Sequence, residues 1–172
     1  MLKSTTVVLT VVALWFLGGS PTWAQTYSSQ EQAEVVKALK DAKVTLQEGL
    51  TASQAQGTPI SGKFEIEHGK LQLSVYTMKG DKLSEVVVDH TTGKVAKSEA
   101  ITEGEDLTAA QAQRAAMTKA KKGLRAAVDA AVKAHAGSRA VSVVPALKDG
   151  HPVATIALAT GDAITTVSEK LD

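Results

Sequence analysis

The side chains of this sequence that could do chemistry do not combine into a catalytic pattern. The 172-residue chain contains no cysteine, which excludes a thiol nucleophile. No serine stands in a Gly-x-Ser-x-Gly turn, and no GxxxxGK[ST] phosphate-binding loop occurs. Glu65 and Glu67 alternate with Phe64 and Ile66, which is the pattern of a solvated strand face rather than of paired catalytic carboxylates. We therefore expect a protein without catalytic residues and without a cofactor.

Two of the four histidines, His68 and His151, each stand beside a glycine in two similar turns. If the two turns met, their imidazole rings could hold a metal ion. The chain has no HxH or HExxH spacing to support such a site. The alternative interpretation is that both are ordinary polar turn residues, and on it we expect no metal site.

The charges of the chain are balanced, with 19 Lys and Arg residues against 18 Asp and Glu residues. This balance gives no basic footprint for nucleic acid, so we expect no nucleic-acid partner. The run Lys119–Arg125 (KAKKGLR) is expected on the outer side of a helix. It would be a solvated face, or alternatively a patch for an acidic partner or a membrane surface, although it lacks the aromatic anchors of an interfacial helix.

The first residues have the order of a secretory signal peptide. Lys3 gives a positive start, Val7–Leu17 is an apolar run of eleven residues, and Thr22-Trp23-Ala24 offers small residues at a cleavage site. The apolar run is shorter than the ~20 residues of a spanning helix, although an uncleaved anchor is the alternative. We expect cleavage after Ala24, a bacterial periplasmic or secreted location, and no membrane insertion of the mature chain.

The chain repeats its apolar pattern at an offset of 81 residues. The pairs that align at this offset include Leu39 with Ala120, Gly69 with Gly150, Val75 with Ile156, Gly80-Asp81 with Gly161-Asp162, and Val86 with Val167. Because a helix and three strands align without a gap, we interpret the pattern as a duplication.

Each copy is expected to be one helix followed by three strands. In the first copy a helix spans residues 28–55, with Ser29 and Gln32 as its capping box. Strands of alternating apolar residues follow at 63–67, 71–77 and 83–89, and their glycine-containing turns predict an antiparallel meander.

In the second copy the helix is expected to begin at Thr108, and the strands at 140–147, 153–159 and 163–169. Pro145 predicts that the first of these strands is an edge strand or is bulged, because proline has no backbone donor. The polar segment Lys97–Asp106 is interpreted as a linker between the copies.

The helix, the meander and the segment Val86–Val95 (VVVDHTTGKV) together resemble the PepSY domain. The resemblance covers Gln30–Ala100 and, more weakly, Leu107–Asp172, where the closing turn is missing. It implies a non-catalytic role, such as inhibition or chaperoning of a peptidase in the bacterial envelope. The partner would then be another envelope or secreted protein, with a peptidase among the candidates.

These observations predict an α+β protein made of a signal peptide (residues 1–24), a first PepSY-like repeat (25–100) and a second one (101–172). Each repeat would be a helix packed on a small three-stranded antiparallel meander. We expect a protein that binds a partner or regulates a peptidase. The alternative is a small-ligand carrier or sensor with a groove between the two repeats. The partner is expected at an open strand edge made of Gly62, Lys63, Phe64, Glu65, Ile66 and Glu67.

Overall fold

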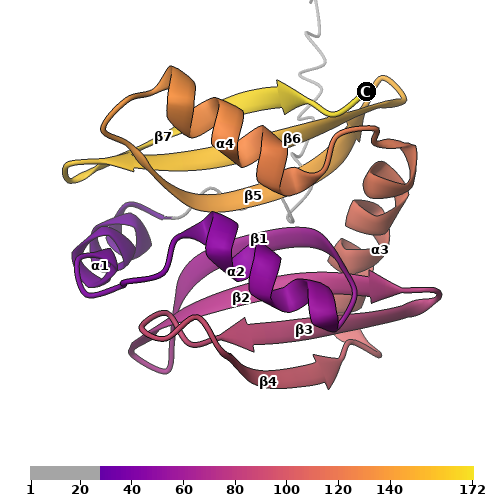
Figure 1. The fold of residues 1–172 in the computed structure, drawn as a ribbon, viewed down its shortest axis with the longest axis horizontal. Coiled ribbons are helices and arrows are strands. Elements are labelled where there is room, and N and C mark those ends of the chain that lie inside the picture. Colours follow the sequence, from indigo (N-terminus) through magenta and orange to yellow (C-terminus); the bar gives the residue numbers. More distant parts are fainter. Residues whose placement is uncertain (1–27) are drawn as a thin grey trace, which may run out of the picture.

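Seven strands lie side by side in one antiparallel sheet with the order β4-β3-β2-β1-β5-β6-β7 (Figure 1). The computed structural model describes residues 28–172. The strands are β1 (Thr58–Glu67), β2 (Lys70–Lys79), β3 (Lys82–Val88), β4 (Val95–Ala100), β5 (Arg139–Lys148), β6 (His151–Thr160) and β7 (Ala163–Lys170). The helices are α1 (Ser29–Leu39), α2 (Leu46–Ala52), the short 3₁₀ helix η1 (Ser53–Ala55), α3 (Gly104–Lys119) and α4 (Leu124–Ala134). The expected α+β class is confirmed, whereas the signal peptide lies outside the described residues.

Two-residue turns with positive φ angles form the β1–β2 and β5–β6 hairpins. β1 and β2 are joined by His68 and Gly69, which have φ angles of 49° and 74°. β5 and β6 are joined by Asp149 and Gly150, with φ angles of 52° and 81°. Two consecutive positive φ angles give a turn whose twist matches that of the flanking strands. The hairpins expected at these positions are therefore confirmed.

The single helix expected over residues 28–55 is wrong, because the chain breaks between α1 and α2. Thr45 caps α2 by accepting from the backbone of Glu48, whose carboxylate bonds back to the backbone N–H of Thr45 at 2.7 Å. The backbone N–H groups of Lys43 and Val44 donate to the carbonyl of His90. The apolar stripe continues through the break, which is why the sequence pattern does not reveal it. The cap of α1 is Ser28 with Glu31, one residue before the expected Ser29.

The expected linker Lys97–Asp106 is wrong as well. Its first residues belong to β4, an outer strand whose six residues are all exposed. Its last residues begin α3, which starts at Gly104 and not at Thr108. The first half of the sheet is therefore a four-stranded meander rather than a three-stranded one.

The basic run Lys119–Arg125 does not lie on the outer side of one helix, because α3 ends at Lys119 and α4 begins at Leu124. In the break, the backbone N–H groups of Lys121 and Lys122 donate to the carbonyl of Leu171, at 2.7 and 2.9 Å. This segment therefore fastens the C-terminal end of the chain, and Leu171 is fully buried there.

The two halves of the sheet meet at β1 and β5. Only two residue pairs form this seam, Gly62 with Val143 and Lys63 with Ser142. β1 is thus an inner strand, and the expectation that it forms an open edge of the sheet is wrong. β5 is also an inner strand, and its bulge lies between Ala140 and Ser142 rather than at Pro145.

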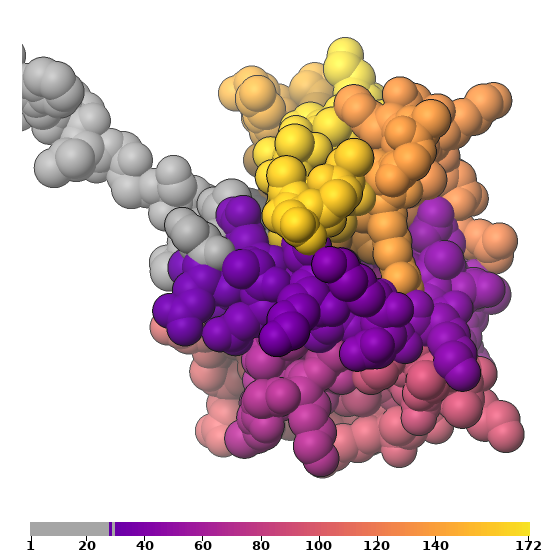
Figure 2. Space-filling model, turned by 90° about the vertical axis from the view of Figure 1, so that its left-hand side faces the viewer, coloured from indigo at the N-terminus to yellow at the C-terminus, as the bar shows by residue number. Residues whose placement is uncertain are grey.

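The main apolar core lies between the sheet and the helices α2 and α4, which cover one of its faces (Figure 1). A Cβ atom on Gly62 would lie 3.1 Å from Leu50 and 3.2 Å from Leu46, so the glycine lets α2 approach the seam closely. Figure 2 shows α1 (indigo) lying across the seam between the C-terminal strands (yellow) and the first half of the sheet. No helix within residues 28–172 is long and apolar enough to cross a membrane.

Candidate functional site

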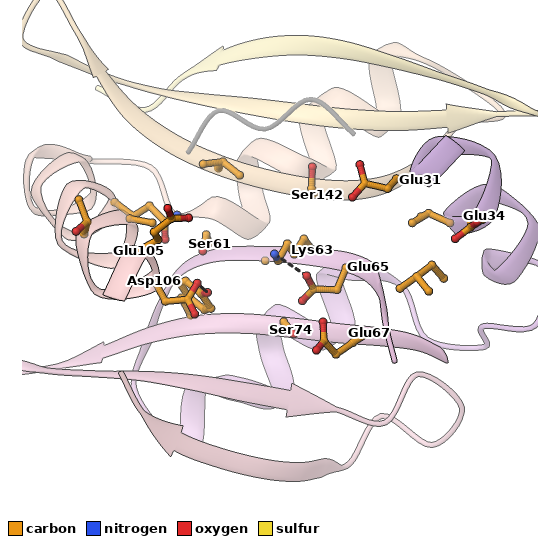
Figure 3. A pocket seen from close by; sticks show the side chains of 18 residues that line it. Glu31, Glu34, Ser61, Lys63, Glu65, Glu67, Ser74, Glu105, Asp106 and Ser142 are labelled. Carbon is orange, nitrogen blue, oxygen red and sulfur yellow. Dashed lines mark hydrogen bonds and ion pairs between the residues drawn. The ribbon is translucent and has the colours of Figure 1, made fainter. Parts of the chain in front are cut away.

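A groove of about 650 Å³ lies on the face of the sheet opposite α2 and α4. Its floor is formed by β1, β2 and β5, and its walls by α1 and α3 (Figure 3). Side chains alternate between the faces of a strand, so Gly62 and Phe64 face α2 whereas Ser61, Lys63 and Glu65 line the groove. The groove therefore spans the seam between the two halves of the sheet.

Strand register positions the floor of the groove. Lys63 lies opposite Ser74 on β2 and opposite Ser142 on β5, so the three side chains form a row across the seam. The Lys63 ammonium is 2.6 Å from the Glu65 carboxylate (Figure 3). The side chain of Lys63 keeps 43% of its surface exposed and that of Glu65 keeps 20%. The centre of the groove thus holds one internally paired positive charge.

The α3 end of the groove carries Glu105 and Asp106 from the first turn of that helix. The phenol of Tyr76 donates a hydrogen bond to Asp106 at 2.6 Å. Burial, together with this bond, raises the pKa of the Tyr76 phenol far above its ordinary value. Tyr76 therefore stays protonated and positions Asp106 rather than acting as a base.

The α1 end of the groove carries Glu31 and Glu34 (Figure 3). Glu31 belongs to the capping box of α1, and its carboxylate accepts from the Ser28 backbone at 2.8 Å. Hydrogen bonds from Ser28 lower the pKa of Glu31, so this carboxylate is ionised at neutral pH. Glu34 accepts from Gln30 at 3.3 Å. With Glu65 and Glu67 from β1, six acidic side chains and one lysine line the groove.

Gln113 of α3 also lines the groove and has an unusual environment. Only 5% of its surface is exposed, and its Oε1 atom has no hydrogen-bond partner among the described residues. A buried acceptor without a partner costs about 1–3 kcal/mol, and native structures contain few of them. The last torsion of a glutamine is soft, so this amide can turn toward a donor held in the groove.

Most of the residues expected at a partner-binding edge line this groove. Gly62, Lys63, Glu65, Ile66 and Glu67 do so, whereas Phe64 is fully buried in the core on the opposite face. Whether they contact a partner stays a prediction.

No local sequence pattern identifies the residues that α1, α3 and β2 add to the groove. They include Glu31, Glu34, Tyr76, Glu105, Asp106 and Gln113. Glu105 and Asp106 are adjacent in the sequence, but they stand at the end of the polar segment Lys97–Asp106, which is typical of a linker.

The structure separates His68 and His151. Because β1 and β5 run antiparallel, the turns after these two strands lie at opposite ends of the sheet, so the two histidines cannot share a metal ion. His151 instead contacts Asp172 at 3.0 Å, and the pKa of that carboxyl is lowered by the contact. Within residues 28–172 no group of three or more His, Asp or Glu side chains is arranged to hold a metal.

The side chains that line the groove can bind a ligand through charge and hydrogen bonds. None of the histidines within residues 28–172 lines the groove, and the Ser74 hydroxyl accepts a hydrogen bond from Gln72 at 2.8 Å rather than contacting a general base. Val35, Ile66 and Val144 add apolar wall surface. No protein-family model, no curated protein and no solved structure matches this chain.

Proposed function

We propose that this protein is a non-catalytic, exported bacterial binding protein that holds its ligand in the groove between its two halves. The observation that carries the proposal is the groove itself, which spans the seam and draws residues from β1 and β5 alike. Its volume is in the range of small-ligand sites, about 300–1,000 Å³. The peptidase partner rests on the PepSY resemblance alone, so we place groove binding first.

The halves that flank the groove are proposed to be duplicated copies. β1 and β2 span residues 58–67 and 70–79, and β5 and β6 have the same bounds shifted by 81. Both helical regions are broken in two, and each break donates two backbone N–H groups to one carbonyl. Those carbonyls belong to His90 and Leu171, which are also 81 residues apart. The groove lies over the seam where these two halves meet.

Export is proposed from the N-terminal sequence. The mature chain should begin at Gln25, because small residues precede it after a short apolar run. Intact mass of the protein recovered from the envelope or the culture fluid tests this, and a mass that retains residues 1–24 would identify the segment as an anchor.

A matched pair of substitutions on α3 tests groove binding. Ala109 lines the groove, whereas Ala115 is exposed on the same helix outside it. Ala109→Trp should fill the groove, and Ala115→Trp should leave it open. The small-molecule fraction of a bacterial extract should raise the Tm of the wild type and of Ala115→Trp by about 5 °C or more. The Tm of Ala109→Trp should not rise.

Circular dichroism of both variants checks that they fold before the comparison is made. Native mass spectrometry of the wild type then gives the mass of the retained compound. An equal shift in both variants, or no shift in the wild type, would reject the groove as the binding site.

A further inference from the structure

Resting on the proposed function, we infer that the groove takes a flexible linear ligand with ammonium groups toward both ends. Free polyamines and lysine-rich peptides share this chemistry. The inference combines the distribution of charge along the groove with the unpartnered, buried Gln113 in its wall.

Four of the six acidic side chains stand at the two ends of the groove, whereas Glu65 and Glu67 lie on its floor. Glu31 and Glu34 stand at the α1 end, and Glu105 and Asp106 stand at the α3 end (Figure 3). These carboxylates come from helices at opposite ends of the groove (Figure 3), so no compact cation can contact both groups at once. A ligand that satisfies both ends must therefore be extended and must carry more than one positive charge.

The centre of the groove does not require a charge in the middle of the ligand. Lys63 stands there with its ammonium 2.6 Å from the Glu65 carboxylate, which is thereby already neutralised. Because this ion pair has no net charge, it adds little attraction for a cation in the middle of the ligand.

Gln113 supplies an independent sign that a donor is missing. Its Oε1 atom is buried without a partner among the described residues. Its side chain lines the groove about one helical turn beyond Ala109 and about two turns beyond Asp106. An ammonium group carries three N–H donors and no acceptor. An N–H group of a ligand bound at this end of the groove would satisfy the Gln113 amide oxygen.

Isothermal titration of the exported chain with spermidine and, separately, with a tetralysine peptide tests the inference. Binding should be one to one and should weaken as salt is added, since these contacts are screened over about 10 Å at 0.1 M salt. Butylamine, which has a single ammonium group, should bind at least roughly tenfold more weakly than the two probes. Binding by spermidine alone would indicate a free polyamine, and binding by tetralysine alone would indicate a basic peptide; either outcome supports the inference.

Charge-neutralising variants separate groove binding from general attraction. Glu34→Gln combined with Glu105→Gln removes one charge from each end of the groove and should weaken binding roughly tenfold. The control combines Glu99→Gln with Asp129→Asn, which remove the same charge from β4 and α4 outside the groove. Its affinity should change by less than about twofold.

Equal weakening in the two double variants would overturn the inference, because binding would then follow net charge. Failure of both probes to bind, while the extract still shifts the wild type but not Ala109→Trp, would overturn the ligand class and leave groove binding standing. Failure of the extract test as well would reject the proposed function itself.

Discussion

Arg139 is expected to hold the broken helical segment of the first half against the second half. It is the first residue of β5, and its guanidinium donates to the carbonyls of Leu39 at 2.9 Å, Ala42 at 3.0 Å and Val44 at 2.7 Å. The guanidinium carbon lies 5.5 Å from the centre of the Phe64 ring. One side chain thus binds three backbone carbonyls at the end of α1 and in the segment that joins α1 to α2.

The size of the effect follows from these contacts. Each hydrogen bond to a charged donor contributes about 1.5–3 kcal/mol when buried. Arg139 is only partly buried, so in a variant water can form some of the hydrogen bonds that the three carbonyls lose. Burial also lowers the pKa of the guanidinium, which shows that desolvation opposes the folded position of the charge. We therefore expect Arg139→Met to lower the free energy of unfolding by about 2–4 kcal/mol.

Urea unfolding followed by circular dichroism measures this loss. Arg125→Met is the matched control, because Arg125 of α4 also reaches the first half but makes only exposed contacts. These are a hydrogen bond to Thr51 at 2.8 Å and an ion pair with Asp129 at 3.8 Å. The control should cost less than about 1 kcal/mol. Arg139→Lys should be intermediate, since an ammonium cannot present the planar fork that the three carbonyls accept. If Arg139→Met costs no more than Arg125→Met, water satisfies the carbonyls and the reasoning is refuted.

Three further predictions concern the stability of the fold. Leu171→Ala should cost about 2–4 kcal/mol in urea melts, because the side chain is fully buried at the end of the chain; a loss below about 1 kcal/mol would mean that this end is not fastened. Val75→Ala should cost about 1–4 kcal/mol and Thr155→Ala no more than about 0.5 kcal/mol, since Val75 is fully buried and Thr155 is exposed; the reverse order would contradict the strand register. Hydrogen bonds from the Thr91 hydroxyl and backbone hold the pKa of Asp89 well below 3.8, so this carboxylate contributes stability that is complete above pH 3.8 and is lost as the pH falls below it. Asp89→Asn keeps the acceptor oxygen and should lose less stability than the wild type between roughly pH 5 and 2; equal acid sensitivity of the two proteins would contradict this.

The sequence determined the elements that depend on near neighbours. Strict apolar alternation placed six of the seven strands, because burial of one strand face imposes that pattern directly. The turns at His68-Gly69 and Gly150 followed from residues that tolerate positive φ angles. The α1 cap was missed by one position because Ser28 and Ser29 are each followed three residues later by an acceptable partner, Glu31 and Gln32.

Only the tertiary structure decided the remaining features. β4 is an outer strand with every side chain exposed, so its sequence resembles a linker and only pairing with β3 makes it a strand. The joining of β1 to β5 depends on two residue pairs about 80 residues apart, which no local pattern encodes. The groove also depends on tertiary contacts. Its acidic residues come from α1, β1 and α3, and the local sequence around each of them is typical of a solvent-exposed surface. They form one site only because the seam brings these elements around a common space.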